Sequence, residues 1–344
     1  MHKFPYRWTL KDAVFTKDKG KVFSCFACGG GSTMGYKLAG FDVIGCNEID
    51  PRMNKVYVAN HHPRLNYLCD IREMVTKELP DELYHLDVLD GSPPCSSFSM
   101  AGSREDGWGV EKKFREGQAE QVLDTLFFDF IDLAKELQPK IVIAENVKGL
   151  MLGEAMKYVR RIYDAFDEAG YMVTHTLCDA SMMGVPQRRE RVFFTAIRKD
   201  LFDQIPQRHD LFYDYPDIDL TFKEAPITCR ECDFEMGDEI KGCYREDYDR
   251  LQRGEPNKYL QSGLVDIDVV HPTITGGYRD KASPMPNWAP QWLSPRDICK
   301  VSSFPQDYDF GKEKAQYICG MSVPPVMMAQ VASRVYDQWL SKLP

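Results

Sequence analysis

The sequence predicts an α/β protein built around a parallel β-sheet, and three observations support this. Between residues 22 and 197, short apolar runs alternate with segments of helical periodicity, as in βαβ units. Loops rich in glycine or proline follow two of these runs, at residues 29–31 and 91–95. After Arg198 the pattern is lost. Because open α/β sheets bind ligands at the carboxyl ends of their strands, we expect the functional residues in such loops.

Each expected element follows from its own pattern. The expected strands are Val22–Phe26, Phe41–Cys46, Val88–Leu89, Ile141–Ala144, Met172–Leu177 and Val192–Ile197. The expected helices are Met34–Ala39, Arg52–Asn60, Thr125–Leu137 and Glu154–Ala169. Apolar residues recur at helical spacing in the third helix, which predicts a buried face, and Pro139 marks its end.

Residues 199–270 differ in composition from the rest of the chain. They are rich in Asp, Tyr and Pro, and they hold 9 basic and 18 acidic residues, whereas the remainder is neutral. The sequence therefore predicts a smaller, separate domain of irregular loops and short strands at 199–270. Residues 21–198 and 271–344 would form the main domain, and residues 1–20 an N-terminal extension.

Sequence signals for regular helices return after His271. Ser294 is expected to cap a helix with Pro295 in its first turn. Pro324 and Pro325 precede the final expected helix, at about Val326–Leu340.

The composition excludes several classes of protein. Of 344 residues, 43% are hydrophobic and 28% charged, which is ordinary for a globular protein. No apolar run reaches about 18 residues, so no membrane span is expected. Met1–Gly20 has no apolar core and does not read as a secretory signal. The eleven cysteines are therefore expected to be reduced thiols in the cytoplasm. The net charge of −9 neither excludes nor supports a nucleic-acid partner.

The run Gly91-Ser92-Pro93-Pro94-Cys95 directly follows an apolar stretch. Two adjacent prolines fix two φ angles and push the preceding residues toward extended conformations. A short strand would thus lead into a stiff loop that presents a cysteine at the edge of the sheet. A thiolate held there is a candidate nucleophile.

The glycines at 29–31 lie between an expected strand and an expected helix, so a ligand could approach the backbone closely there. The Gly-Lys-Ser/Thr pattern of phosphate loops is absent, which disfavours nucleoside triphosphates. Glu48 follows the next strand, where an acidic residue suits the hydroxyls of a ribose. Asp70 could accept a hydrogen bond from an adenine amino group. Cys25 and Cys28 form a CxxC pair, for which a redox role is the alternative.

Charged groups follow two further strands. Glu145, in Glu145-Asn146-Val147, ends the most apolar strand. The apolar surroundings of that strand could raise the pKa of Glu145 and allow it to donate a proton. Gln187, Arg189 and Arg191 alternate before the last strand and would share one face. The alternatives are a capping pair and a solvated run of charge.

Taken together, these motifs resemble those of the cytosine-C5 DNA methyltransferases of bacterial or phage type. They occur in the order of that family and cover nearly the whole chain from about Lys21. The motifs are Phe26–Gly35, Glu48, Asp70-Ile71, Gly91–Cys95 with Phe98-Ser99, Glu145–Val147, Gln187–Arg191 and Gly320–Pro325.

The resemblance implies a Rossmann-like S-adenosylmethionine-dependent methyltransferase domain and a smaller target-recognition domain at 199–270. Arg296 and Phe304-Pro305 resemble the element that organises that smaller domain. The C-terminal segment would return to complete the cofactor site. The residues implied to bind S-adenosylmethionine are Phe26, Ala27, Gly30, Gly31, Glu48, Ile49, Asp70, Ile71, Pro93, Leu126, Ser322 and Val323. No metal is implied.

The resemblance also implies the chemistry. Cys95 would bond to carbon 6 of a cytosine, Glu145 would protonate N3, and Arg189 and Arg191 would lie near the pyrimidine oxygen and the catalytic groups. A stacked base is out of reach, so the target would be flipped out of duplex DNA. The loop after Cys95, with Gly102, Gly107, Gly109, Arg104, Lys112, Lys113 and Arg115, is expected to close over DNA and to be mobile without it. A monomer and a cognate restriction endonuclease are also expected.

Three positions depart from the family, which usually has glycine at Cys28, asparagine at Met321 and glutamine at Ser96. None of these changes removes a catalytic group. Two alternative functions stay open, namely an RNA cytosine-C5 methyltransferase and a catalytically idle DNA-binding regulator. A zinc site is a third alternative, carried by Cys229, Cys232 and Cys243, but no fourth ligand is evident.

Overall fold

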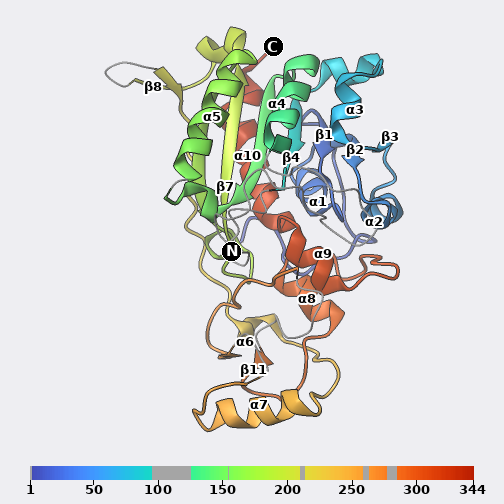
Figure 1. Ribbon diagram of the computed structural model, residues 1–344, viewed down its shortest axis with the longest axis vertical. Helices are drawn as coiled ribbons and strands as arrows, with labels where there is room; N and C mark the ends of the chain where they lie inside the picture. Colours follow the sequence, from blue (N-terminus) through green and yellow to red (C-terminus); the bar gives the residue numbers. More distant parts are fainter. Residues whose placement is uncertain (1, 95–124, 154, 210–213, 259–262, 277–284) are drawn as a thin grey trace.

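The computed structural model describes residues 2–94, 125–153, 155–209, 214–258, 263–276 and 285–344. The molecule has two lobes (Figure 1). The larger lobe surrounds a central β-sheet, and the smaller lobe carries α6, α7 and β11 at the opposite end of the long axis. Among the described residues, no helix combines the length and apolar character needed to cross a membrane.

The central sheet has seven strands in the order β3-β2-β1-β4-β5-β7-β6. These strands are β1 (Lys21–Cys25), β2 (Asp42–Glu48), β3 (Leu65–Leu68), β4 (Val88–Gly91), β5 (Ile141–Val147), β6 (Tyr171–Asp179) and β7 (Glu190–Arg198). Each of the six expected strands is present, and β3 is a short additional edge strand. The central sheet and its helices confirm the predicted α/β class.

One strand departs from the expected parallel arrangement. β7 runs antiparallel to both of its neighbours, β5 and β6. The connection from β6 to β7, residues 180–189, is too short for a crossover helix, and only antiparallel neighbours can be joined so directly. This reversal places the start of β7 beside the end of β5.

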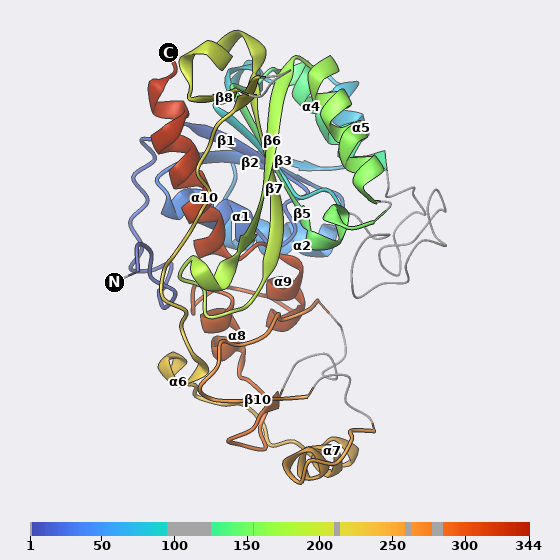
Figure 2. The same cartoon turned by 90° about the vertical axis from the view of Figure 1, so that its left-hand side faces the viewer.

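Helices cover both faces of the sheet (Figure 2). One face carries α1 (Gly31–Leu38) and α10 (Pro325–Gln338), and the other α3 (Ile71–Val75), α4 (Leu126–Leu137) and α5 (Ala155–Glu168). α2 (Pro51–His61) packs against the C-terminal segment that holds α8 (Pro295–Val301) and α9 (Ala315–Met321). The apolar face predicted for α4 is buried, and α4 ends at Leu137, two residues before Pro139.

The C-terminal segment returns to the sheet, as the sequence suggested. Ser294 caps α8, because its side chain accepts the backbone N–H of Asp297 at 3.1 Å and Pro295 fills the first turn. α10 then packs beside α1 so closely that a Cβ on Gly35 would overlap Met328.

The structure divides the 199–270 segment between the two lobes. Its first part, with η5 (Lys199–Gln204), β8 (Gln207–His209) and β9 (Asp214–Pro216), stays with the larger lobe, because Leu201, Phe202, Ile218 and Leu220 are buried in the core beside α10. The smaller lobe begins near α6 (Cys229–Cys232) and continues through α7 (Cys243–Gln252), β10 (Leu264–Val265) and β11 (Met285–Pro286). Its core is small and centres on Ile240, Tyr248 and Met285.

The N-terminal segment runs between the lobes. The side chains of Tyr6 and Arg7 donate to backbone carbonyls of α6. The Trp8 indole donates to the carbonyl of Ser303 at 3.0 Å, and the backbone N–H of Leu10 to Asp307 at 2.6 Å. The segment therefore ties the smaller lobe to the loop between α8 and α9.

Candidate active site

The proline loop leaves the sheet at its centre. β4 lies between β1 and β5, and Gly91 pairs in register with Cys25 of β1 and Ala144 of β5. The Asn146 side chain at the end of β5 donates to the carbonyl of Pro93 at 3.2 Å. Because Asn146 is buried, this bond fixes the loop against β5. Cys95, the predicted nucleophile, lies outside the described residues, as does the loop predicted to close over DNA.

Glu145 and Arg191 form an ion pair where β5 and β7 meet. The Arg191 Nε lies 2.8 Å from the Glu145 Oε1, and both side chains are largely buried. Burial lowers the pKa of Arg191, and the charge of Glu145 opposes that change. The guanidinium fixes the direction of the carboxylate. The adjacent residue Asn146 bonds to the proline loop, so the end of β5 positions both the Glu145 carboxylate and that loop.

Arg189 is buried and contacts the backbone of two distant segments. It donates to the carbonyl of Ile274 at 3.1 Å and to those of Gly320 and Ser322 at 2.9 Å. Its described hydrogen bonds therefore hold the C-terminal segment rather than Glu145, although the charge of Glu145 is close enough to act on it. Burial lowers the pKa of Arg189 well below its ordinary value. A role for this residue near the base stays a prediction.

Gln187 completes this motif from a buried position. Its amide oxygen accepts the backbone N–H of Ile274 at 3.2 Å, and its amide nitrogen lies 3.3 Å from the Ser302 Oγ. The motif therefore ties the start of β7 to the segments around 274 and 302.

The glycine loop, residues 26–31, packs against protein on one side. A Cβ on Gly29 would overlap Ile318, one on Gly30 would overlap His61, and one on Gly31 would overlap the Val323 carbonyl. Glycine is thus required here by the C-terminal segment and α2.

Glu48 lies beside this loop with a buried carboxylate. It accepts the backbone N–H of Cys28 at 2.7 Å and that of Asp50 at 2.8 Å. Burial raises the pKa of Glu48, and these two donors oppose the rise. Cys28 has φ 47, in the left-handed region that favours glycine. This explains why glycine is usual at this position in the resembling family.

The structure brings several other predicted cofactor residues to this loop. Ser322 is buried, lies against Gly31, and its Oγ has no hydrogen-bond partner among the described residues. Phe26, Ile71 and Leu126 belong to one apolar cluster. Three further predicted residues adjoin these in sequence. Ala27 and Val323 are buried, and Ile49 is partly exposed, at 37%.

Asp70 has a local partner. It caps α3 and pairs with Arg72 at 2.6 Å, and the hydrogen bond from Arg72 lowers its pKa. An adenine amino group would therefore have to share this carboxylate.

Three site residues were not expected from the sequence. Asp90, at the end of β4, is buried and accepts the hydroxyls of Ser24 and Ser32 at 2.7 and 2.8 Å. Burial raises its pKa to about 7. The signal was present, since a carboxylate ends an otherwise apolar run before the proline loop. His61 and Tyr308, which lie behind the glycine loop, carry no local signal.

The model of the C-5 cytosine-specific DNA methylase family matches residues 20–337. The chain belongs to this family.

Among curated members of the family, the type II methyltransferase M.FnuDI of Fusobacterium nucleatum is 39% identical over 53% of this chain and 48% of its own. M.NgoPII of Neisseria gonorrhoeae is 37% identical over 53% and 49%. The chain thus spans about half the length of these relatives. M1.HphI of Haemophilus parahaemolyticus is 28% identical over 90% of this chain and 85% of its own.

Solved structures share the fold of this methylase-family chain. A prophage-encoded protein of E. coli, described as a DNA modification methyltransferase, superposes with a TM-score of 0.67 at 20% identity, covering 92% of this chain and 99% of its own. A DNMT2 variant from Spodoptera frugiperda gives a TM-score of 0.62 at 17% identity, covering 90% and 98%.

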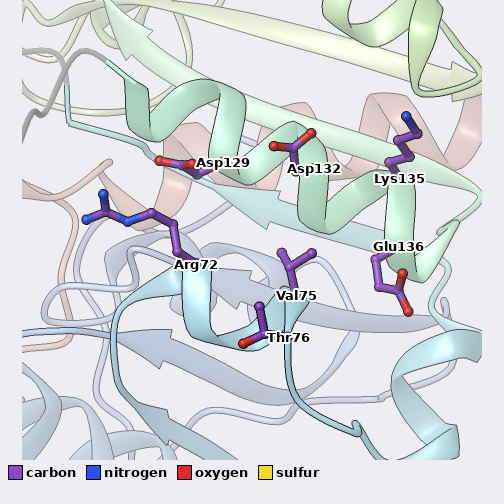
Figure 3. A pocket seen from close by; sticks show the side chains of 7 residues that line it. All are labelled: Arg72, Val75, Thr76, Asp129, Asp132, Lys135 and Glu136. Atoms are coloured by element: carbon purple, nitrogen blue, oxygen red, sulfur yellow. The ribbon is translucent and has the colours of Figure 1, made fainter.

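An open pocket of this family member borders the Asp70–Arg72 pair, because Arg72 is one of its lining residues. It occupies the groove between α3 and α4 (Figure 3). Its lining residues are Arg72, Val75, Thr76, Asp129, Asp132, Lys135 and Glu136. None of them is a predicted site residue, and their mixed charges suit no particular ligand. Among the described residues, no cluster of His, Cys, Asp or Glu has the geometry of a metal site.

Proposed function

We propose that this chain methylates carbon 5 of a cytosine in duplex DNA, with S-adenosylmethionine as methyl donor. The observation that carries the proposal is the buried Glu145–Arg191 pair, which Asn146 links to the proline loop that leads to Cys95. Relatives named type II methyltransferases support DNA as the substrate. They also support a cognate restriction endonuclease as partner.

The residues around the glycine loop fit S-adenosylmethionine. Glu48 offers a buried carboxylate to ribose hydroxyls, and the unpartnered Ser322 Oγ offers a hydroxyl beside Gly31. Phe26, Ile71 and Leu126 supply an apolar wall. When bound, this cofactor supplies an electrophilic methyl group to carbon 5 of the activated base.

The chain's own residues would activate the base. The Cys95 thiolate adds to carbon 6 of a flipped cytosine, and Glu145 delivers a proton to N3, so the ring becomes an enamine with a nucleophilic carbon 5. Arg191 holds the Glu145 carboxylate in place during this transfer. Loss of the carbon-5 proton to a base, with return of the N3 proton to Glu145, then allows the carbon–sulfur bond to break, which regenerates Cys95 and the Glu145 carboxyl.

Covalent trapping tests this proposal. Duplex DNA containing 5-fluorocytosine is incubated with the protein and S-adenosylmethionine, because fluorine at carbon 5 blocks the final elimination. We expect a denaturation-resistant adduct that is lost in Cys95→Ala and falls by about 100-fold in formation rate in Glu145→Gln, the usual size of a general-acid contribution. Cys243→Ala, at an exposed cysteine of the smaller lobe, is the matched control.

Other outcomes would redirect the proposal. An adduct with substituted RNA alone would indicate an RNA methyltransferase. Cofactor binding without any adduct would indicate a DNA-binding regulator.

A further inference from the structure

The carbonyl of Gly29, in the glycine loop, accepts a hydrogen bond from a tyrosine 279 residues away in the chain. The donor is the hydroxyl of Tyr308, which is buried in the loop between α8 and α9. The Nε2 of His61, the last residue of α2, lies 2.8 Å from the same hydroxyl. Because the hydroxyl gives its single proton to Gly29, His61 must donate from Nε2.

His61 also connects to the first turn of α1. Its ring stacks on Tyr57 with the ring centroids 4.4 Å apart, and the Tyr57 hydroxyl lies 3.0 Å from the Thr33 Oγ1. The array thus contacts both sides of the turn from the glycine loop into α1, at the Gly29 carbonyl before α1 and at Thr33 within α1.

The same ring restricts the backbone between those points. Gly30 has φ 87, and a Cβ there would lie only 2.0 Å from the His61 Nε2. The imidazole therefore fills the space that a side chain would need, and the left-handed turn has no room to relax in that direction.

The electrostatics of the site keep this histidine neutral. Burial lowers the pKa of His61 well below its ordinary value, and the charges of Lys37 and His62 lower it further. The Lys37 Nζ lies 3.2 Å from the His61 carbonyl. A neutral ring with its proton on Nε2 fits the donor role that the Tyr308 contact requires.

We propose that His61 and Tyr308 are positioning residues that hold the glycine loop in its cofactor-binding conformation. Gly29 follows directly on Cys28, whose N–H is bonded to Glu48, so a shift of the Gly29 peptide would also shift the carboxylate assigned to the ribose. The inference rests on the proposed function, because it assigns the loop to S-adenosylmethionine.

The test is Tyr308→Phe, which removes the hydroxyl and keeps the ring. We expect Kd for S-adenosylhomocysteine, measured by calorimetry, and KM for S-adenosylmethionine to rise about fivefold, the usual value of one hydrogen bond. KM for DNA should stay unchanged. Tyr336→Phe is the matched control, since its ring packs on Phe41 and lies on the far end of α10.

A second variant separates positioning from general destabilisation. His61→Gln keeps a donor on a side chain of similar reach, so it should weaken cofactor binding less than His61→Ala. Combined with Tyr308→Phe, His61→Gln should add little, because the hydrogen bond that it perturbs is made to the Tyr308 hydroxyl, which Tyr308→Phe has already removed.

Three results would overturn the inference: unchanged cofactor binding in Tyr308→Phe, an equal loss in Tyr336→Phe, or fully additive effects in the double variant. A wild-type protein that binds no S-adenosylmethionine would instead overturn the proposed function, and this inference with it.

Discussion

At the scale of single residues, Asp90 makes the free energy of unfolding depend on pH. Its carboxyl is buried between Ser24 and Ser32, and burial raises its pKa from 3.8 to about 7. The folded state therefore binds this proton more tightly than the unfolded chain. Stability from Asp90 is complete below about pH 4 and is lost as the pH rises toward 7, by an amount on the order of 4 kcal/mol.

Asp90→Asn tests this dependence, because the amide keeps the shape and cannot ionise. We expect the unfolding free energy of the wild type to fall relative to that of the variant between pH 5 and pH 8, measured by urea denaturation. The control is Asp81→Asn, the same change at a carboxylate that is 93% exposed. Parallel curves for wild type and Asp90→Asn would contradict the prediction.

Cys28 carries backbone strain that glycine would relieve. At φ 47 a side chain costs on the order of 1 kcal/mol. The free energy of unfolding of Cys28→Gly should therefore exceed that of Cys28→Ala by about 1 kcal/mol, because the alanine variant loses the thiol but keeps the Cβ. Thermal and urea unfolding of both variants give the comparison, and an equal or more stable alanine variant would show that the turn is not strained.

At the scale of elements, a helix or strand could be predicted from the sequence where its local pattern agrees with its tertiary contacts. α4 was predictable because Leu126, Phe130 and Leu137 mark one buried face and Pro139 follows its end. The direction of β7 was not expected, although the short β6–β7 connection indicates it. α7 was missed, although Tyr244, Tyr248 and Leu251 recur at helical spacing, because its remaining residues are charged.

The site divides in the same way. The positions of Glu48, Glu145 and Arg191 were predictable, because each lies near the start or end of a strand. The pairing of β5 with β7 brings Glu145 and Arg191 together, and the roles of all three residues stay predictions. His61 and Tyr308 were not, because they meet only after α2 and the α8–α9 loop pack around the glycine loop. Arg189 was predicted for its charge, yet its described contacts are with backbone carbonyls of the C-terminal segment. No pattern within 187–191 indicates those partners.

At the scale of the whole molecule, the N-terminal segment links the two lobes. Its contacts run from α6, through Tyr6 and Arg7, to Ser303 and Asp307 beside the glycine loop. The sequence predicted an extension at residues 1–20 without a role. These contacts tie α6 of the smaller lobe to the loop between α8 and α9.

Trp8→Ala removes the central contact of this link. We expect KM and Kd for duplex DNA to rise several-fold, because the smaller lobe loses a fixed position, whereas cofactor affinity should stay unchanged. Fluorescence anisotropy with DNA and calorimetry with S-adenosylhomocysteine measure the two effects. Val14→Ala, at a side chain that is 86% exposed in the same segment, is the control. Equal DNA affinity in both variants would show that the segment is only a surface covering.

The contacts between the glycine loop and the C-terminal segment have a consequence for biosynthesis. Domains fold as the ribosome releases them, from the N-terminus onward. Gly29 is made 279 residues before Tyr308, and Ser322 and Val323 follow later still. During translation the loop therefore lacks the C-terminal part of its surroundings, although Glu48 and His61, which also contact it, are made soon after it. A nascent chain therefore holds the loop and the proline motif long before the C-terminal segment can complete the proposed cofactor site.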